Sequence, residues 1–242
     1  MNTTSIDNRM LAGVSVPATA IVDRAMEYAR RECEPYLFNH VVRSWLFAAR
    51  IGQLQGIEYD AEVVAVGTLL HDITLNERFA GPRRFEVEGA DLARTFARDV
   101  GFDKRRAQLI WDSVALNSTP SIGLYKEAEV ALCTAGICLD VVGLQYELIP
   151  SGEMKTIVAE FPRLGMKSRM TRCFCGIARS QPPIEKVLES FSACPSNSGP
   201  ATGVGRRMTA RRIPYTVWYS AIAITARVSV LLGCRNSSRI VK

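Results

Sequence analysis

The stretch "VVAVGTLLHDITLN", residues 63–76, decides the fold, because an apolar run of helical length leads directly into a histidine–aspartate pair. A helix that is apolar on every side is buried in a protein core rather than lying on the surface. His71 and Asp72 are therefore expected in the interior of a helical protein. The chain has only one other histidine, His40, and its context "LFNHVVRSW", residues 37–45, is similarly apolar.

Apolar residues recur at helical intervals along most of the chain. Pro17 stands at an expected first helical position in "PATAIVDRAMEYARR", and Asp60 is an expected N-cap for the helix that leads to His71. No stretch shows sustained alternation with period two, so we expect no sheet and assign the chain to the all-α class. The expected helices cover residues 17–31, 38–55, 60–75, 85–100, 103–117, 127–143, 152–161 and 167–179.

The net charge of +6 is concentrated in the C-terminal quarter. Residues 181–242 carry nine basic and two acidic residues, whereas residues 1–180 carry 21 basic and 22 acidic residues, a net charge of −1. Such a neutral body lacks the basic balance typical of nucleic-acid binding, so no nucleic-acid partner is expected. We expect an N-terminal extension over residues 1–15, a helical domain over 16–180, and a divergent basic tail over 181–242 that is irregular or partly disordered.

The cysteines and the N-terminus indicate a cytoplasmic protein. Seven cysteines without metal-finger or redox spacing suggest reduced thiols, and the N-terminus lacks the basic and apolar parts of a secretory leader. The segment "VWYSAIAITARVSVLLG", residues 217–233, is apolar, but Arg227 interrupts it and it is short for a bilayer span. We therefore expect no stable membrane insertion. Assembly into a homo-oligomer stays open.

Asp140, like the histidine–aspartate pair, is a polar residue that the sequence predicts to be buried. It lies in "EVALCTAGICLDVVGL", residues 129–144, a helix that is apolar on nearly every side and that has no lysine or arginine nearby. A buried carboxylate loses several kcal/mol of hydration unless a cation receives it. One divalent ion would satisfy the two imidazoles and the two carboxylates of His40, His71, Asp72 and Asp140 together. Taken singly, each histidine could be hydrogen-bonded without a metal, and Asp140 could cap a helix or pair with a distant arginine.

Together with further segments, these residues resemble the HD-domain metal hydrolases, and among them the fungal cyanamide hydratases and their relatives. The resemblance runs from about Val16 to about Arg179, and it includes "LFNHVVRSWLFA", "GTLLHDITL", "RRFEVEGADLARTF", "WDSVALNSTP" and "EVALCTAGICLDVVGL". It implies an HD-type helical bundle over residues 16–180. It also implies one zinc or iron ion, with ligands at His40, His71, Asp72 and Asp140. Phosphohydrolase branches often carry a further metal-binding histidine near "RFEVEG", and its absence here favours a single ion.

The chain departs from this family at two places. The segment similar to "VALNSTP" usually has a histidine where this chain has Asn117, and asparagine cannot titrate near neutrality. Loss of a general acid or base typically lowers a rate by about 10²–10⁴-fold. In addition, the family's closing helices are absent or rewritten after "CFCGIARSQPP". Both departures concern turnover rather than metal binding.

In the hydratase interpretation, the ion activates a water for attack on an electrophilic carbon, such as a nitrile carbon. Asp72 would take up and return a proton while also serving as a ligand. Arg43, three residues after His40, either reaches the pocket or pairs with a core carboxylate. Asn117 would orient the amino or nitrile group of the substrate, and Thr74 and Phe79 are weaker candidates for the pocket mouth.

Three functions stay open. The first is an HD-type hydratase or hydrolase acting on a small molecule. It ranks first, so the sequence leans towards an enzyme. Many relatives act in fungal secondary metabolism, so the substrate could be a larger intermediate than cyanamide. The second is an HD phosphohydrolase, which the neutral body and the missing histidines disfavour. The third is a catalytically impaired scaffold, left by the change at Asn117 and by the altered C-terminus.

Overall fold

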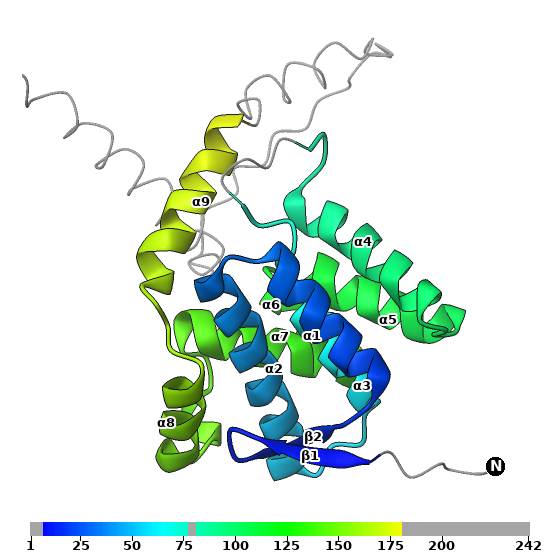
Figure 1. Cartoon of the computed structure of the whole chain (residues 1–242), viewed down its shortest axis with the longest axis vertical. Coiled ribbons are helices and arrows are strands. Elements are labelled where there is room, and N and C mark those ends of the chain that lie inside the picture. Colours follow the sequence, from blue (N-terminus) through cyan, green and yellow to red (C-terminus); the bar gives the residue numbers. More distant parts are fainter. Residues whose placement is uncertain (1–6, 77–80, 181–242) are drawn as a thin grey trace, which may run out of the picture. The chain divides into compact units, whose positions relative to one another are not determined.

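The structure is a computed structural model that describes residues 7–76 and 81–180 (Figure 1). The chain divides into two compact units, Met1–Met170 and Thr171–Lys242. Of the second unit, the structure describes only the part of α9 that lies after residue 170. The expected basic tail over 181–242 and Phe79 fall outside the described residues.

Helices make up most of the described chain, which confirms the all-α class. The helices are α1 (Ala20–Glu32), α2 (Pro35–Gln55), α3 (Ala61–Leu69), α4 (Phe85–Asp99), α5 (Lys104–Ala115), α6 (Pro120–Gly123), α7 (Ala128–Val142), η1 (Tyr146–Leu148), α8 (Ser151–Glu160) and α9 (Met166–Ser180). Most ends lie within three residues of the expected ones. The short helix α6 falls in a segment that was expected to be only a break. Within the described ranges, no helix has both the length and the apolar character needed to cross a bilayer.

A β-hairpin near the N-terminus corrects the expectation that the protein has no sheet. Strands β1 (Asn8–Leu11) and β2 (Val14–Pro17) pair antiparallel through a turn in which Ala12 and Gly13 have φ values of 47° and 80°. Two consecutive positive φ values are typical of the tight turns that match the twist of a hairpin. The strands have four residues each, too short for a clear alternation. Pro17 thus ends β2, and α1 begins three residues later, after the N-cap Thr19.

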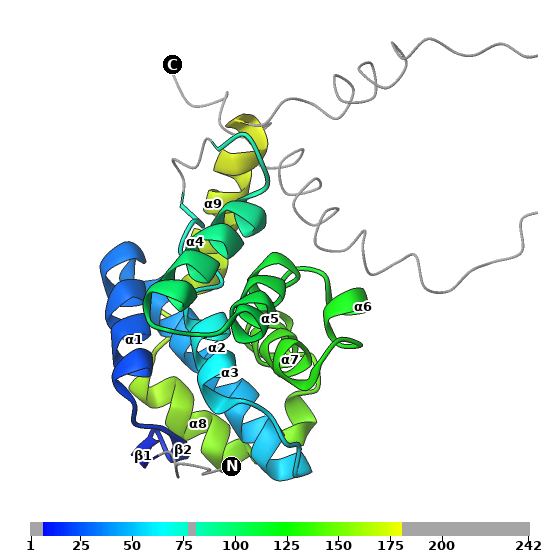
Figure 2. The same ribbon diagram turned by 90° about the vertical axis from the view of Figure 1, so that its right-hand side faces the viewer.

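Helix α2 lies at the centre of the first unit and packs most extensively against α7 (Figure 2). Gly136 of α7 makes this approach close, because a Cβ atom there would clash with the carbonyl oxygen of Ser44 and would lie 2.7 Å from the backbone nitrogen of Ala48. Asp140 follows Gly136 by four residues and His40 precedes Ser44 by four, so both lie one turn from this contact. The glycine contact therefore brings Asp140 next to His40.

Helix α3 carries the apolar run that precedes the histidine–aspartate pair. Asp60 caps it as expected, because its carboxylate accepts hydrogen bonds from the backbone nitrogens of Glu62 and Val63, both at 3.1 Å. The helix ends at Leu69 instead of continuing to residue 75, and the chain turns over residues 70–74. His71 and Asp72 therefore lie in a buried turn, where their side chains are not constrained to helical spacing.

Candidate metal centre

Three predicted ligands, from α2 and from the turn after α3, meet in the core. Nε2 of His40 lies 3.1 Å from Nε2 of His71, and Oδ2 of Asp72 lies 3.2 Å from the His71 atom and 3.6 Å from the His40 atom. The three side chains are at most 5% exposed. The group is one that could hold a metal ion, in agreement with the expected cofactor.

The hydrogen bonds made by the two Nδ1 atoms determine how the histidine rings are oriented, and therefore which atoms face one another. Nδ1 of His71 lies 2.7 Å from the carbonyl oxygen of Thr68, and Nδ1 of His40 lies 2.7 Å from Oδ2 of Asp140. Both partners only accept hydrogen bonds, so each Nδ1 must carry a proton and donate it. In the neutral rings, each Nε2 then presents a lone pair. Two nitrogen lone pairs and a carboxylate oxygen therefore converge, and the arrangement requires a proton or a metal ion between them.

The distances fit an ion of ordinary size. Ligand distances at zinc are about 2.0–2.1 Å for histidine nitrogen and about 2.0–2.2 Å for carboxylate oxygen. The three ligand atoms lie 3.1, 3.2 and 3.6 Å from one another, a spacing that one ion with ligand distances of this length could bridge. Two imidazoles and a carboxylate are also a donor set that suits zinc or iron.

Asp140 lies on the other side of the His40 ring, outside this group of three atoms. Its two carboxylate oxygens accept hydrogen bonds from Arg43, at 2.6 and 2.9 Å, and Arg163 lies 3.1 Å from Oδ1. This differs from the expectation that Asp140 is a metal ligand. The cation that receives the carboxylate is Arg43, and of the two alternatives for Arg43 the structure shows the core pairing. Asp140 is thereby placed to orient His40.

The charges of the buried groups follow from this arrangement. Burial by itself would raise the pKa of Asp72, but His71 and His40 hold that pKa below its ordinary value. Burial likewise opposes ionisation of Asp140, whose pKa is nevertheless lowered by His40 and Arg43. For His71, burial lowers the pKa and the Asp72 carboxylate raises it, with a net increase. Both carboxylates are therefore ionised at neutral pH.

Two further predicted residues stabilise the turn that carries His71. The side-chain nitrogen of Asn117, which follows α5, donates a hydrogen bond to the carbonyl oxygen of His71 at 3.2 Å. Thr74 donates to the carbonyl oxygen of Phe85 at 2.7 Å and lies where a Cβ atom at Gly89 would be only 2.9 Å away. Thr74 therefore ties the turn to α4, and Asn117 ties it to α5.

Sequence reasoning missed three groups around the centre. The carbonyl oxygen of Thr68 accepts the hydrogen bond that orients the His71 ring, and Arg163 forms an ion pair with Asp140. The Cys33 side chain lies near enough to Asp72 for the carboxylate charge to raise its pKa. Burial raises the pKa of Cys33 to about 12, with a smaller contribution from the negative charge of Asp72, so its thiol stays neutral. A backbone carbonyl has no sequence signal, and Arg163 lies in a loop that resembles any other basic loop.

A scan against models of protein families gave no match for this chain, and a search of curated proteins found none with significant similarity. The feature of the described residues that bears on function is the centre itself: a buried group of His40, His71 and Asp72 that could hold one ion, next to an ion pair of Asp140 and Arg43.

Proposed function

We propose that this protein is a metal-dependent hydratase or hydrolase of the HD type. Its substrate would be a small molecule with an electrophilic carbon, such as the nitrile carbon of cyanamide. The observation that carries the proposal is the convergence of the Nε2 atoms of His40 and His71 with Oδ2 of Asp72. The likeness of the surrounding segments to HD-type hydratases supports the choice of reaction.

Each residue of the centre would have a distinct task. His40, His71 and Asp72 would hold the ion, which when bound would supply a Lewis acid and lower the pKa of a water from about 15.7 towards about 7. Asp140 orients the His40 ring by accepting its Nδ1 proton, and Arg43 keeps Asp140 ionised. Such outer partners fix the tautomer of a ligating histidine and raise its basicity.

Asp72 is the group to which we assign proton transfer, because its carboxylate lies within the converging group and stays ionised. Asn117 is less suited to this task, since it does not titrate and its amide already donates to His71. Asn117 would therefore act as a positioning residue that holds the turn. In this proposal, the proton chemistry is handled by one carboxylate, that of Asp72.

A metal-bearing scaffold without turnover is the second candidate. The nearly complete burial of His40, His71 and Asp72, together with the non-titrating Asn117, favours it. Zinc sites that are purely structural contribute directly to folding stability. A scaffold and an enzyme would thus both bind metal, and they differ only in catalysis.

The test combines metal content with two activity assays on the full chain. Protein purified with zinc or with iron should bind one ion per chain and convert cyanamide to urea. The variants His71→Ala and Asp72→Asn should lose both properties, whereas Asp99→Asn, which changes an exposed carboxylate, should retain them. Metal without urea formation would favour the scaffold. Hydrolysis of nitrophenyl phosphate in place of urea formation would favour a phosphohydrolase, and unchanged metal content in His71→Ala would refute the ligand assignment.

A further inference from the structure

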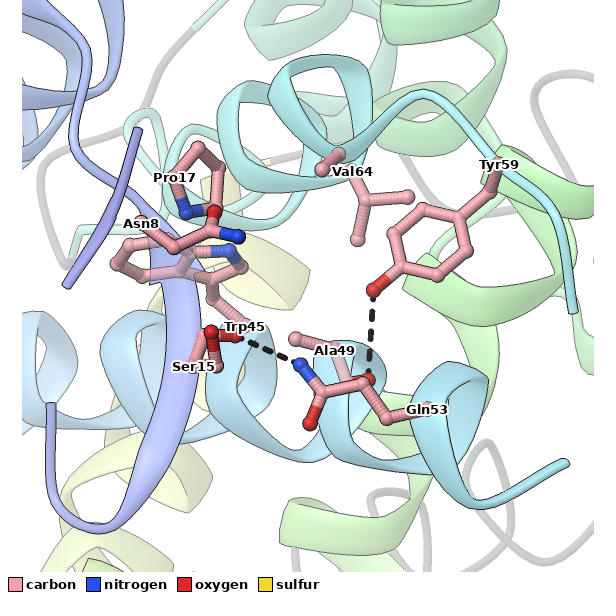
Figure 3. Close-up of a pocket in the computed structure, with 9 residues that line it drawn as sticks. Asn8, Ser15, Pro17, Trp45, Ala49, Gln53, Tyr59 and Val64 are labelled. Atoms are coloured by element: carbon pink, nitrogen blue, oxygen red, sulfur yellow. Dashed lines mark hydrogen bonds between the residues drawn. The ribbon is translucent and has the colours of Figure 1, made fainter. Parts of the chain in front are cut away.

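Helix α2 is attached to different parts of the chain at its two ends. Near its C-terminal end, Gln53 donates a hydrogen bond to the carbonyl oxygen of Ser15 at 2.6 Å, beside a cavity of about 260 Å³ (Figure 3). None of the predicted metal ligands lines that cavity. The N-terminal half of α2, which carries His40 and Arg43, instead contacts the loop between α8 and α9, residues 161–165. The attachment at the metal end of α2 is therefore this loop.

The loop supplies hydrogen-bond acceptors that Arg43 does not find on Asp140. A guanidinium has five N–H donors in a fixed fork, and Asp140 receives only donors from Nε and Nη2 of Arg43. Nη1 of Arg43 donates to the carbonyl oxygen of Phe161 at 2.9 Å. Beside it, the side-chain nitrogen of Asn39 donates to the carbonyl oxygen of Pro162 at 2.8 Å. The loop carbonyls thus hold the guanidinium in the orientation in which it meets the carboxylate.

Arg163 belongs to the same loop and contacts Asp140 twice through a single atom. Its Nη1 donates to the backbone carbonyl oxygen of Asp140 at 2.9 Å and lies 3.1 Å from the carboxylate oxygen Oδ1. Asp140 is in the last turn of α7, where backbone carbonyl oxygens lack partners within the helix. One cation therefore links the backbone and the carboxylate of the same residue, which restricts the rotation of the Asp140 side chain.

The backbone of the loop has a conformation that one of its residues disfavours. Leu164 has a φ of 47°, and Gly165 follows with a φ of 72°. For leucine this left-handed region is unfavourable, and such a conformation persists where the surrounding structure imposes it. The Leu164 side chain does not explain the conformation by burial, because Leu164 is 48% exposed. The contacts that hold the loop are those of Pro162 with α2 and of Arg163 with α7.

Asp140 connects Arg163 to the metal centre. Its Oδ2 lies 2.7 Å from Nδ1 of His40, whose proton it accepts, and Nε2 of the same ring is one of the three converging atoms. The partner of the outer nitrogen fixes the orientation of a ligating histidine and raises its basicity. A carboxylate held by Arg163 stays aligned with His40, whereas a carboxylate free to rotate would lose this alignment for part of the time.

We propose that Arg163 is a positioning residue of the metal centre, which increases the affinity of the centre for its ion by holding Asp140 against His40. This role rests on the metal centre of the proposed function, and it does not depend on the reaction catalysed there. Loss of the direct outer partner of a ligating histidine lowers metal affinity by about 10–100-fold. Arg163 lies one contact further out and its side chain is 44% exposed, so its removal should lower the affinity by about three- to ten-fold.

Zinc dissociation constants of the full chain, measured by competition with a chelator, test this role. Arg163→Met keeps the length of the side chain but removes its charge and donors, so zinc binding should weaken by about three- to ten-fold. Arg163→Lys should restore most of the affinity, because a single nitrogen makes both contacts with Asp140. Arg169→Met is the matched control and should bind zinc as the parent does. Arg169 is 49% exposed and forms an ion pair of the same length, 3.1 Å, with Glu34.

NMR of the zinc-loaded protein with ¹⁵N-labelled histidine distinguishes positioning from a general loss of stability. The chain has only two histidines, so two Nδ1–H signals are expected, and Asp140→Asn assigns the signal of His40 by changing its acceptor. In Arg163→Met, the His40 signal should shift and exchange faster with water. The His71 signal should not move, because its Nδ1 donates to the carbonyl oxygen of Thr68.

Equal zinc dissociation constants in Arg163→Met and the parent would overturn the role of Arg163. Arg163→Lys binding zinc no better than Arg163→Met, or equal shifts of the two histidine signals, would overturn it as well. A parent protein that binds no zinc would refute the proposed function and this role together. If the parent binds zinc but forms no urea, only the proposed catalysis fails, and the zinc affinities of the variants still decide the role of Arg163.

Discussion

Replacing Asp140 with asparagine distinguishes the two roles considered for this carboxylate, partner of Arg43 and metal ligand. Asparagine keeps the size of the side chain but removes its charge. Arg43 would then remain as a buried guanidinium without a counter-charge, although it would keep its hydrogen bond to the carbonyl oxygen of Phe161 at 2.9 Å. His40 would lose the carboxylate that accepts its Nδ1 proton at 2.7 Å.

The expected cost follows from the burial of the pair. The side chains of Asp140 and Arg43 are both 0% exposed, so solvent does not screen their interaction. Removing one partner of a buried ion pair typically destabilises a protein by about 3–5 kcal/mol. Loss of the outer partner of a ligating histidine weakens metal affinity by about 10–100-fold without abolishing it. We therefore expect Asp140→Asn to unfold at clearly lower urea concentration and to bind metal weakly.

A double-mutant cycle measured by urea unfolding provides the decisive assay. If Arg43 is the partner, Asp140→Asn combined with Arg43→Met should be more stable than Asp140→Asn alone, because the uncompensated charge is gone. Asp99→Asn serves as the control for a carboxylate without a buried partner. A double variant no more stable than the single one would refute the pairing, and complete loss of metal in Asp140→Asn would restore Asp140 as a direct ligand.

Three further predictions concern packing, pH and turnover. Gly136→Ala should destabilise the protein by about 1–3 kcal/mol or more in urea unfolding, because the added methyl meets the α2 backbone at Ser44, whereas Gly152→Ala meets nothing within 4 Å and should be neutral or stabilising. The pKa of His71 is raised, so its contribution to the stability of the metal-free protein is complete below pH 6.5 and is lost as the pH rises through the raised value. The melting temperature of the metal-free protein should fall over that range, and a flat profile would contradict this. Asn117→His should increase urea formation if a missing proton relay limits turnover, and an unchanged rate would show that no proton relay is missing at this position.

Much of the helical architecture could be predicted from the sequence, because helices are determined by local patterns. The all-round apolar run before His71, the N-cap at Asp60 and the glycine breaks all act over a few residues. The hairpin could not be found in this way. Its strands have four residues each, and its turn depends on the backbone of Ala12 and Gly13 rather than on a strong sequence signal.

For the candidate centre, too, one part could be predicted from the sequence and another part could not. The sequence by itself determined that His40, His71 and Asp72 are buried, and that such polar groups need a common cation or proton, because the apolar residues around them leave no other solvation. Only the tertiary structure decided which cation receives Asp140. Arg43 lies 97 residues away along the chain, and the contact at Gly136 brings the two side chains together. Partner choice for a buried charge is a property of long-range packing, and no local pattern contains it.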